Sequence, residues 1–513
     1  MSPRATTPVM QKSPGATARM PRVASKDSRV ERERHSYDLV VLGAGPAGLT
    51  AAHLAAREGA SVALIERSVL GGTSLNTGSI PSNAIIRSAR LFASLRECSL
   101  LHDSGVLEPA ANLQRVMERV YRIRSRIAAY SSRERLERAG IDVYDGTGRF
   151  DTPQSIVVGT ARLQFGKALI ATGARPTAAQ ISGLEEGSYL TSESIFDLVE
   201  LPARLAVVGG GPLGCELAQA FCRLGSRVTI VQDEPKFLPR EERDAAQTLA
   251  ESMARDGVEI FLNTRVVGAH VEAAGTRLET RSNDVVGEVV ADRVLVSVGR
   301  TPNVETLGLQ LAGVAMGDDG AIRVDEFLCT SNPLIYAAGD VCMAHQFTHV
   351  AESTARIATS NLLGAVRRRH TELTIPWCTF CDPEIAHVGL QVMEARGQGI
   401  PVKTFTVMMQ DVDRAITDRQ DNGFVKIHVR EGSDTIIGAT IVASRASEMI
   451  NELCVAMSTG IGLRKLADVL HAYPTQSEAI RLAAMACADE SPTARPAPTQ
   501  AHVVDPGTPR RSR

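Results

Sequence analysis

The sequence predicts an α/β fold that contains two Rossmann-like dinucleotide-binding domains. The main observation is a short apolar strand, a glycine-rich turn and a helix in direct succession, first at residues 37–58 and again at residues 204–224. A second apolar strand follows each helix, as a βαβ unit requires. The length supports this organisation, because 513 residues suffice for about three or four domains of roughly 150 residues each.

The first unit has the pattern G-x-G-x-x-G at Gly43, Gly45 and Gly48. Glycines at these places let the backbone approach a pyrophosphate, and the start of the following helix supplies N–H donors and a favourable dipole. The next strand ends at Glu66, where a carboxylate can accept hydrogen bonds from a ribose. A plain tight turn would also use glycine, but the strand, the helix and the terminal acid together favour a dinucleotide site.

The second unit repeats the pattern at Gly209, Gly211 and Gly214. Its next strand leads to Gln232 instead of an acid, and a side-chain amide can still hydrogen-bond a ribose. Two acids, Asp233 and Glu234, follow directly, and their charge would repel the 2′-phosphate of NADPH. We therefore expect NAD(H) or NADP(H) here, with a preference for NADH.

The charge balance favours a small-molecule partner. The 56 Lys and Arg residues nearly balance the 58 Asp and Glu residues, which argues against a nucleic acid or a membrane surface as partner. No apolar run reaches the ~20 residues of a membrane span. The nine cysteines do not form the pattern of a disulfide framework, so we expect a reducing, cytoplasmic location.

Both ends of the chain are predicted to be disordered tails, at residues 1–35 and 488–513. These segments are rich in Pro, Ser, Thr and Arg and lack apolar periodicity. The first has no apolar segment typical of a secretory signal, although its basic start leaves a transit peptide open.

Longer motifs give the chain a resemblance to a known family from about residue 36 to residue 487. Besides the two glycine patterns, these motifs are GGTSLNTGSIPS at 71–82, ATGARP at 171–176, VGRTPN at 298–303, AAGD at 337–340, QFTHVA at 346–351 and YPT at 473–475. They resemble the flavin-dependent pyridine nucleotide-disulfide oxidoreductases, which include dihydrolipoamide dehydrogenase, mercuric reductase and soluble pyridine nucleotide transhydrogenase. The resemblance implies FAD on the first unit, a nicotinamide nucleotide on the second, and a C-terminal α+β interface domain that forms a homodimer.

The resemblance also implies domain boundaries. The FAD-binding domain would comprise residues 36–190 and 297–370, the NAD(P)-binding domain residues 191–296, and the interface or dimerisation domain residues 371–487.

Cofactor-binding residues follow from the same resemblance. Asp340 would accept a hydrogen bond from the flavin ribityl chain, and a helix that begins near Thr348 and His349 would direct its positive end at the flavin. His349 would act mainly through its backbone, the alternative being simple packing. The residues expected at FAD are Gly43, Gly45, Gly48, Glu66, Gly72, Thr73, Asn83, Gly148, Thr172, Gly173, Asp340, Thr348 and His349. Those expected at the nicotinamide nucleotide are Gly209, Gly211, Gly214, Glu216, Gln232, Val266 and Gly299.

The chain departs from the family at the positions that carry out disulfide chemistry. Ser74 and Ser79 stand where disulfide reductases of this family have a redox-active cysteine pair. Serine cannot form a redox bond, and its hydroxyl is not ionised at neutral pH. Tyr473 stands where the family has an acid–base histidine, although the glutamate that would hold that histidine is retained as Glu478. His471, two residues away, is expected to be structural.

Other cysteines do not replace the missing pair. Cys378 and Cys381 form a CxxC sequence without a second pair or a histidine cluster at zinc spacing, so we expect a structural role and no metal site. Cys487 stands alone and does not reproduce the vicinal cysteines of mercuric reductase.

These observations predict an FAD-dependent NAD(P)H oxidoreductase that passes hydride from nicotinamide to flavin N5 and on to a non-disulfide acceptor. The acceptor would be a small molecule, and a second NAD(P)+ is its most concrete form, as in the transhydrogenases. The alternative is a non-catalytic FAD- and NAD-binding redox sensor or interaction protein. Dihydrolipoamide dehydrogenase and mercuric reductase activities are less favoured, because both use sulfur chemistry that Ser74 and Ser79 cannot supply.

Asn83 generates a first prediction. It replaces a family lysine whose ammonium lies near flavin N5 and pairs with the glutamate matched here by Glu216. Loss of this positive charge disfavours negative charge on reduced flavin. We expect a lower flavin reduction potential than in relatives that have the lysine, and redox titration of the purified protein measures it. An equal or higher potential would contradict the charge argument.

Overall fold

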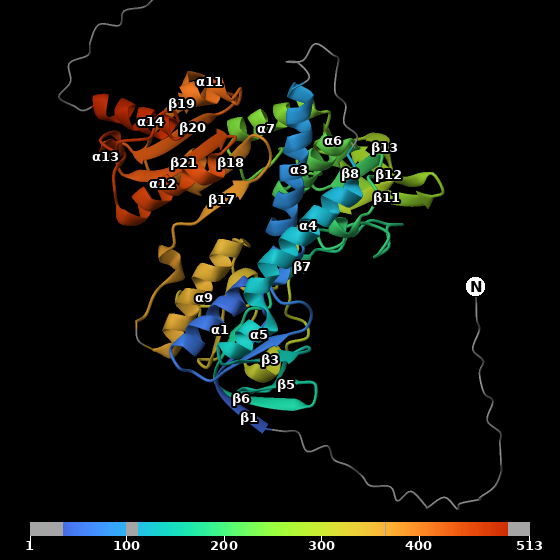
Figure 1. Cartoon of the computed structure of the whole chain (residues 1–513), viewed down its shortest axis with the longest axis vertical. Helices are drawn as coiled ribbons and strands as arrows, with labels where there is room; N and C mark the ends of the chain where they lie inside the picture. Colours follow the sequence, from blue (N-terminus) through green and yellow to red (C-terminus); the bar gives the residue numbers. More distant parts are fainter. Residues whose placement is uncertain (1–33, 99–110, 365, 491–513) are drawn as a thin grey trace, which may run out of the picture.

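The computed structural model describes residues 34–98, 111–364 and 366–490, which form three lobes (Figure 1). The predicted tails lie outside the described residues except at their inner ends. There the first strand begins at Arg34 and the last helix ends at Asp489, so the ordered chain is slightly longer than predicted. Both additions extend apolar elements that are already paired or packed. Among the described helices, none is long and apolar enough to cross a membrane.

The first lobe is built on a mixed sheet with the order β3-β2-β1-β6-β5-β4, and β16 pairs with β6 on the other side. The parallel strands are buried on both faces, which is why they read as continuous apolar runs. Helices α1 and α9 pack against each other beside this sheet (Figure 1). The strands are β1 (Arg34–Leu42), β2 (Val62–Glu66), β3 (Ile141–Asp145), β4 (Arg149–Thr152), β5 (Ser155–Val158), β6 (Ala161–Ile170) and β16 (Ile335–Ala337), and the helices are α1 (Pro46–Arg57), α5 (Arg133–Arg138), α8 (Leu309–Ala312) and α9 (Thr348–Leu363).

The second lobe repeats the βαβ arrangement on a parallel sheet of order β10-β9-β8-β14. An antiparallel sheet, β11-β12-β13, is inserted before its last strand. The chain passes between the first two lobes along the short antiparallel pair of β7 and β15. The elements are β7 (Ala174–Pro176), β8 (Arg204–Val208), α6 (Pro212–Leu224), β9 (Arg227–Val231), α7 (Arg243–Asp256), β10 (Glu259–Phe261), β11 (Arg265–Glu272), β12 (Gly275–Ser282), β13 (Val285–Ala291), β14 (Arg293–Val296) and β15 (Arg300–Pro302).

The third lobe is an α+β unit on an antiparallel sheet of order β17-β18-β21-β20-β19. Helices α12 and α14 bury their apolar residues against it, including Leu453 and Ile480. The elements are β17 (Pro376–Thr379), β18 (Glu384–Gly389), α10 (Val392–Gly397), β19 (Val402–Met408), α11 (Asp413–Thr417), β20 (Phe424–Arg430), β21 (Ile436–Ala443), α12 (Ala446–Thr459), α13 (Leu463–Ala467) and α14 (Glu478–Asp489). Together the three lobes confirm the predicted fold class.

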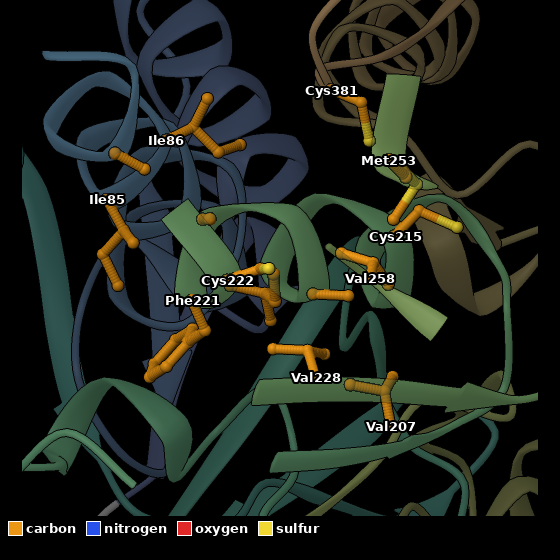
Figure 2. Close-up of a cluster of buried hydrophobic side chains, with 14 of the residues drawn as sticks. Ile85, Ile86, Val207, Cys215, Phe221, Cys222, Val228, Met253, Val258 and Cys381 are labelled. Atoms are coloured by element: carbon orange, nitrogen blue, oxygen red, sulfur yellow. The ribbon is translucent and has the colours of Figure 1, made fainter. Parts of the chain in front are cut away.

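Helix α3 (Ser79–Cys98) joins the lobes. It follows the short helix α2 (Gly72–Asn76) in the first lobe, packs against α4 (Leu113–Ala128), and then runs alongside α6 (Figure 1). Figure 2 shows the shared core, in which Ile85 and Ile86 of α3 lie near Phe221 of α6. Cys381 of the third lobe belongs to the same cluster. Burial of a side chain such as Phe221 contributes about 2–3 kcal/mol, so this core holds the lobes in fixed positions.

Candidate functional site

The first lobe contains a cavity of about 1750 Å³ that reaches the third lobe. Ordinary small-molecule pockets measure about 300–1000 Å³, so this cavity has the size for an extended ligand. A smaller cavity of about 140 Å³ continues it around Gly148 and shares Gly43, Glu66 and Thr172 with it. The large cavity is lined by most of the residues expected at FAD: Gly43, Gly45, Glu66, Gly72, Thr73, Thr172, Gly173, Asp340, Thr348 and His349.

Close backbone contacts explain the glycines at the first turn. Gly43 has a φ of +97°, and a Cβ there would lie 2.4 Å from the carbonyl oxygen of Ala171. A Cβ on Gly72 would lie 2.6 Å from the Cα of Gly45, so the loop before α2 rests directly on the turn. Gly48 does not line the cavity, because it packs against the carbonyl of Gly43. These contacts form a cradle without side chains at the start of α1, which suits a pyrophosphate.

Glu66 and Gln232 each accept a hydrogen bond from a backbone amide of the glycine turn in their own βαβ unit. Glu66 accepts hydrogen bonds from the amides of Ala44 at 2.7 Å and Ser68 at 2.9 Å. The Oε1 atom of Gln232 accepts the amide of Gly210 at 2.6 Å, so the second unit copies the first with a neutral side chain. A Cβ on Gly211 would meet nothing within 4 Å, so this cradle is open as well.

Val266 and Gly299 lie near the second unit without direct evidence of a ligand role. Val266 is buried in the core of the second lobe. The carbonyl of Gly299 accepts a hydrogen bond from the Thr177 amide at 3.0 Å.

The motif VGRTPN contains two site residues that the sequence analysis did not assign. Arg300 donates to Asp340 at 3.1 Å and to the carbonyl of Ala174 at 2.7 Å. Its buried Nε atom has no partner among the described residues, which suits an anionic ligand. Burial raises the pKa of Asp340, while Arg300 opposes this shift. Asn303 and Thr172 exchange two hydrogen bonds at 2.8 and 2.9 Å, which tie the two motifs together.

Helix α9 begins at Thr348, as expected, and its first residues line the cavity. The hydroxyl of Thr348 lies 2.5 Å from that of Ser74. The ring of His349 is hydrogen-bonded through Nε2 to the carbonyl of Pro376 at 2.8 Å, so this side chain serves the contact with the third lobe. A role of His349 at the flavin through its backbone stays a prediction.

The fold and this cradle match known proteins. A family model described as pyridine nucleotide-disulphide oxidoreductase matches residues 37–355, and the dimerisation domain of that family matches residues 375–484. The chain belongs to this family. The second match supports a homodimer, as predicted, and the family implies binding of FAD and a nicotinamide nucleotide.

Relatives and solved structures agree with this assignment. The mercuric reductase of Staphylococcus aureus is 33% identical over 449 residues, which cover 88% of this chain and 82% of that protein. The dihydrolipoyl dehydrogenase of Chlamydia muridarum is 33% identical over 86% of this chain and 95% of its own. The structure of LpdA from Mycobacterium tuberculosis has a TM-score of 0.81 and 30% identity, and the match covers 88% of this chain and 99% of LpdA. The flavoprotein disulfide reductase RclA of Escherichia coli has a TM-score of 0.77 and 29% identity, with 86% and 98% covered.

Ser74 and Ser79 lie on two successive helices beside the cavity. Ser74 lies in α2 and Ser79 begins α3, and both line the cavity. Asn83 is not among the residues that line the cavity, and its assignment to FAD stays a prediction. Its amide donates to the carbonyl of Ser79 at 3.0 Å, since the short side chain bonds within its own helix.

Glu216 is buried and is not among the residues that line the large cavity, and its assignment to the nicotinamide nucleotide stays a prediction. Its Oε1 atom accepts the amide of Phe380 at 3.0 Å. Burial raises the pKa of Glu216 to about 7, and the Phe380 amide opposes this shift.

Tyr473 and Glu478 have different hydrogen-bond partners. Tyr473 is 69% exposed, and its hydroxyl donates to Asp413 at 2.6 Å. Glu478 instead pairs with Arg481 at 2.5 Å. Neither Tyr473 nor Glu478 lines the cavity of its own chain. His471 is mostly buried and contacts Glu452 at 2.8 Å, which fits a structural role.

Cys378, Cys381 and Cys487 are free cysteines. Burial raises the pKa of all three thiols, which disfavours the reactive thiolate. Among the described residues, no group of three or more His, Cys, Asp and Glu side chains could hold a metal ion.

The raised pKa of Glu216 predicts a specific dependence of stability on pH. The ordinary pKa of this carboxyl is 4.5 and its folded value is about 7, so the folded state binds the extra proton between these values. Stability from this group is therefore present below about pH 4.5 and is lost as pH rises to about 7, by up to about 3 kcal/mol.

Glu216→Gln should remove this loss, because the amide cannot ionise. Urea unfolding at several pH values measures the free energy of unfolding, with Glu118→Gln at an exposed position as the control. Equal pH dependence in wild type and Glu216→Gln would contradict the prediction.

Proposed function

We propose that this chain is an FAD-dependent NAD(P)H oxidoreductase whose acceptor is not a disulfide. The observation that carries the proposal is the combination of two intact dinucleotide cradles with Ser74 and Ser79 at the sulfur positions, where Ser74 is hydrogen-bonded to Thr348. FAD, when bound, supplies hydride chemistry between nicotinamide C4 and flavin N5. Because the chain has no thiol pair at the flavin, the electrons must leave for the acceptor without a sulfur relay.

Binding and orientation are the work of the chain's own residues. The turn from Gly43 and the start of α1 supply N–H donors to a pyrophosphate, and Asp340 with Arg300 holds the middle of the cofactor. The start of α9 stabilises negative charge through its dipole. Pro212, where some relatives have a bulky aromatic gate, leaves the nicotinamide side open. Positioning of this kind supplies much of the rate of a hydride transfer.

The state of Tyr473 supports a nicotinamide nucleotide as the acceptor. Its hydroxyl proton is engaged by Asp413, and this contact raises the pKa of Tyr473, so the phenol is a poor acid. Glu478 is engaged by Arg481. Oxidised nicotinamide needs only a hydride, whereas a disulfide also needs protons, so a site without a free acid–base pair suits transhydrogenation. The relatives named mercuric reductase and dihydrolipoyl dehydrogenase therefore do not define the activity proposed for this chain.

NADH is the favoured donor. Gln232 uses its amide oxygen on Gly210, and the adjacent Asp233 and Glu234 are exposed. Their negative charge disfavours the 2′-phosphate of NADPH.

Anaerobic stopped-flow absorbance tests the proposal. We expect NADH to bleach the bound flavin faster than NADPH does, and the reduced protein to be reoxidised by a thio-nicotinamide analogue but not by lipoamide. A flavin that neither nucleotide reduces would reject the proposal and favour the non-catalytic sensor. Turnover with lipoamide would also reject it.

The double variant Ser74→Cys, Ser79→Cys tests whether the missing sulfur alone prevents the disulfide reaction step. We expect the two cysteines to form a disulfide beside the flavin and anaerobic reduction to take two equivalents of NADH per flavin instead of one. Ser74→Cys alone is the control and should take one. If the oxidised double variant also takes one equivalent, the loop does not hold the two positions as proposed.

A further inference from the structure

Two buried carboxyls and one partly exposed guanidinium come together where the three lobes meet. Arg90 of α3 donates through Nη2 to Glu384 of β18 at 3.1 Å and to the carbonyl of Cys381 at 2.8 Å. Glu216 of α6 lies beside them and accepts the amide of Phe380. The Nε atom of Arg90 is buried without a partner among the described residues.

The charges of this cluster do not balance unless one carboxyl holds a proton. Arg90 and Glu384 are the charged groups that act on Glu216, with opposite effects. The thiols of Cys215, Cys378 and Cys381 also face Glu216, but burial raises the pKa of each, so they stay neutral. One cation therefore serves two buried carboxyls, and buried charge without a partner is costly.

Hydrogen bonds decide which carboxyl holds the proton. Glu384 accepts hydrogen bonds from three donors: the Arg90 guanidinium, the Ser447 amide at 3.0 Å and the Ser447 hydroxyl at 2.7 Å. Glu216 accepts only the Phe380 amide. Donors stabilise the ionised form, so Glu216, which has the fewest, is the carboxyl that changes state.

The cluster is connected to the flavin cavity through two elements. Phe380, whose amide binds Glu216, lines the cavity, and so does Ser79 at the start of α3. Arg90 lies on the same helix, seven residues beyond Asn83, the position of the lost lysine. At an effective dielectric constant of about 20, charges about 10 Å apart alter each other's proton affinity roughly tenfold.

We propose that Glu216 takes up a proton from solvent when the flavin is reduced, so that a neutral carboxylic acid replaces the missing ammonium in balancing the charge of reduced flavin. Glu216 acts from outside the cavity and is a positioning residue for charge. The inference rests on the flavin of the proposed function but not on its acceptor.

The step balances without a further reactant. With NADH, the C4–H bond breaks and the N5–H bond forms as hydride carries two electrons, so the flavin itself consumes no solvent proton. The solvent proton forms the O–H bond of Glu216. The ionised group is populated only above about pH 7, and with a tenfold rise in proton affinity we expect about half a proton per flavin near pH 7.5.

Two measurements count this proton on the intact holoprotein. A pH-indicator dye in weak buffer reports proton uptake during anaerobic reduction by NADH. Potentiometric titration of the flavin with mediators gives the total proton count from the slope of the midpoint potential against pH. This total includes one solvent proton for N5–H, so uptake by Glu216 is the excess over one, and the titration does not require reaction with NADH. If NADH fails while the electrode succeeds, the proposed function is wrong but this inference is still decided.

Three variants separate the outcomes. Glu216→Gln should abolish the uptake, because the amide cannot ionise. Asn83→Lys should abolish it as well, since the restored ammonium keeps Glu216 ionised. Glu241→Gln is the matched control, because burial also raises the pKa of Glu241 to about 7, but its partner is Trp377 at 3.0 Å. The control should retain the wild-type uptake.

The inference is overturned if Glu216→Gln retains the wild-type proton count, or if Glu241→Gln loses it equally. Should Glu216→Gln fail to fold, the reduced-minus-oxidised infrared spectrum of the wild-type protein decides the question. Appearance of a protonated carboxyl band on reduction at pH 7.5, absent from Asn83→Lys, supports the inference, and its absence from wild type overturns it.

Discussion

The placement of both cofactor cradles depends on the contact between α6 and the loop that begins the third lobe. Arg223 of α6 binds Asp256 at 2.8 Å and Asp382 at 2.6 Å, and Gln219 exchanges hydrogen bonds with the backbone of Asp382. Buried ion pairs of this kind contribute little net stability, but loss of one partner leaves a buried charge and is strongly destabilising. The contact therefore specifies one arrangement of the lobes. Helix α3 packs against α6 and begins beside the cavity, so the position of the cavity follows from that arrangement.

The loop of Ser74 and Ser79 shows that sulfur chemistry and cofactor geometry are separable. The loop is held by backbone contacts, above all by the approach of Gly72 to Gly45, and by the hydroxyl pair of Ser74 and Thr348. None of these contacts requires a thiol. The chain can therefore lose the cysteine pair and keep the cradle, whereas replacement of either glycine would push the loop away from the turn.

The same separation extends to the charges around the flavin. Asn83 bonds within its own helix, and Glu216 is buried against Phe380 with Arg90 and Glu384 nearby. Tyr473 and Glu478 each take a different partner. In both cases the remaining acid is satisfied locally, because an unpaired buried or partly buried charge is costly. The substitutions thus form a consistent set.

The sequence by itself determined the fold class, the two glycine turns, and the placing of Glu66 at the end of one strand and Gln232 just after another, because each is written in residues close together in the chain. It also located VGRTPN but did not assign Arg300 or Asn303. Only the tertiary structure decided the partners of Glu216, Tyr473 and Glu384. The Phe380 contact spans 164 residues and the Asp413 contact spans 60, and local patterns carry no information about such pairs. Burial, which sets the charge state of Glu216, likewise exists only once the three lobes have packed together.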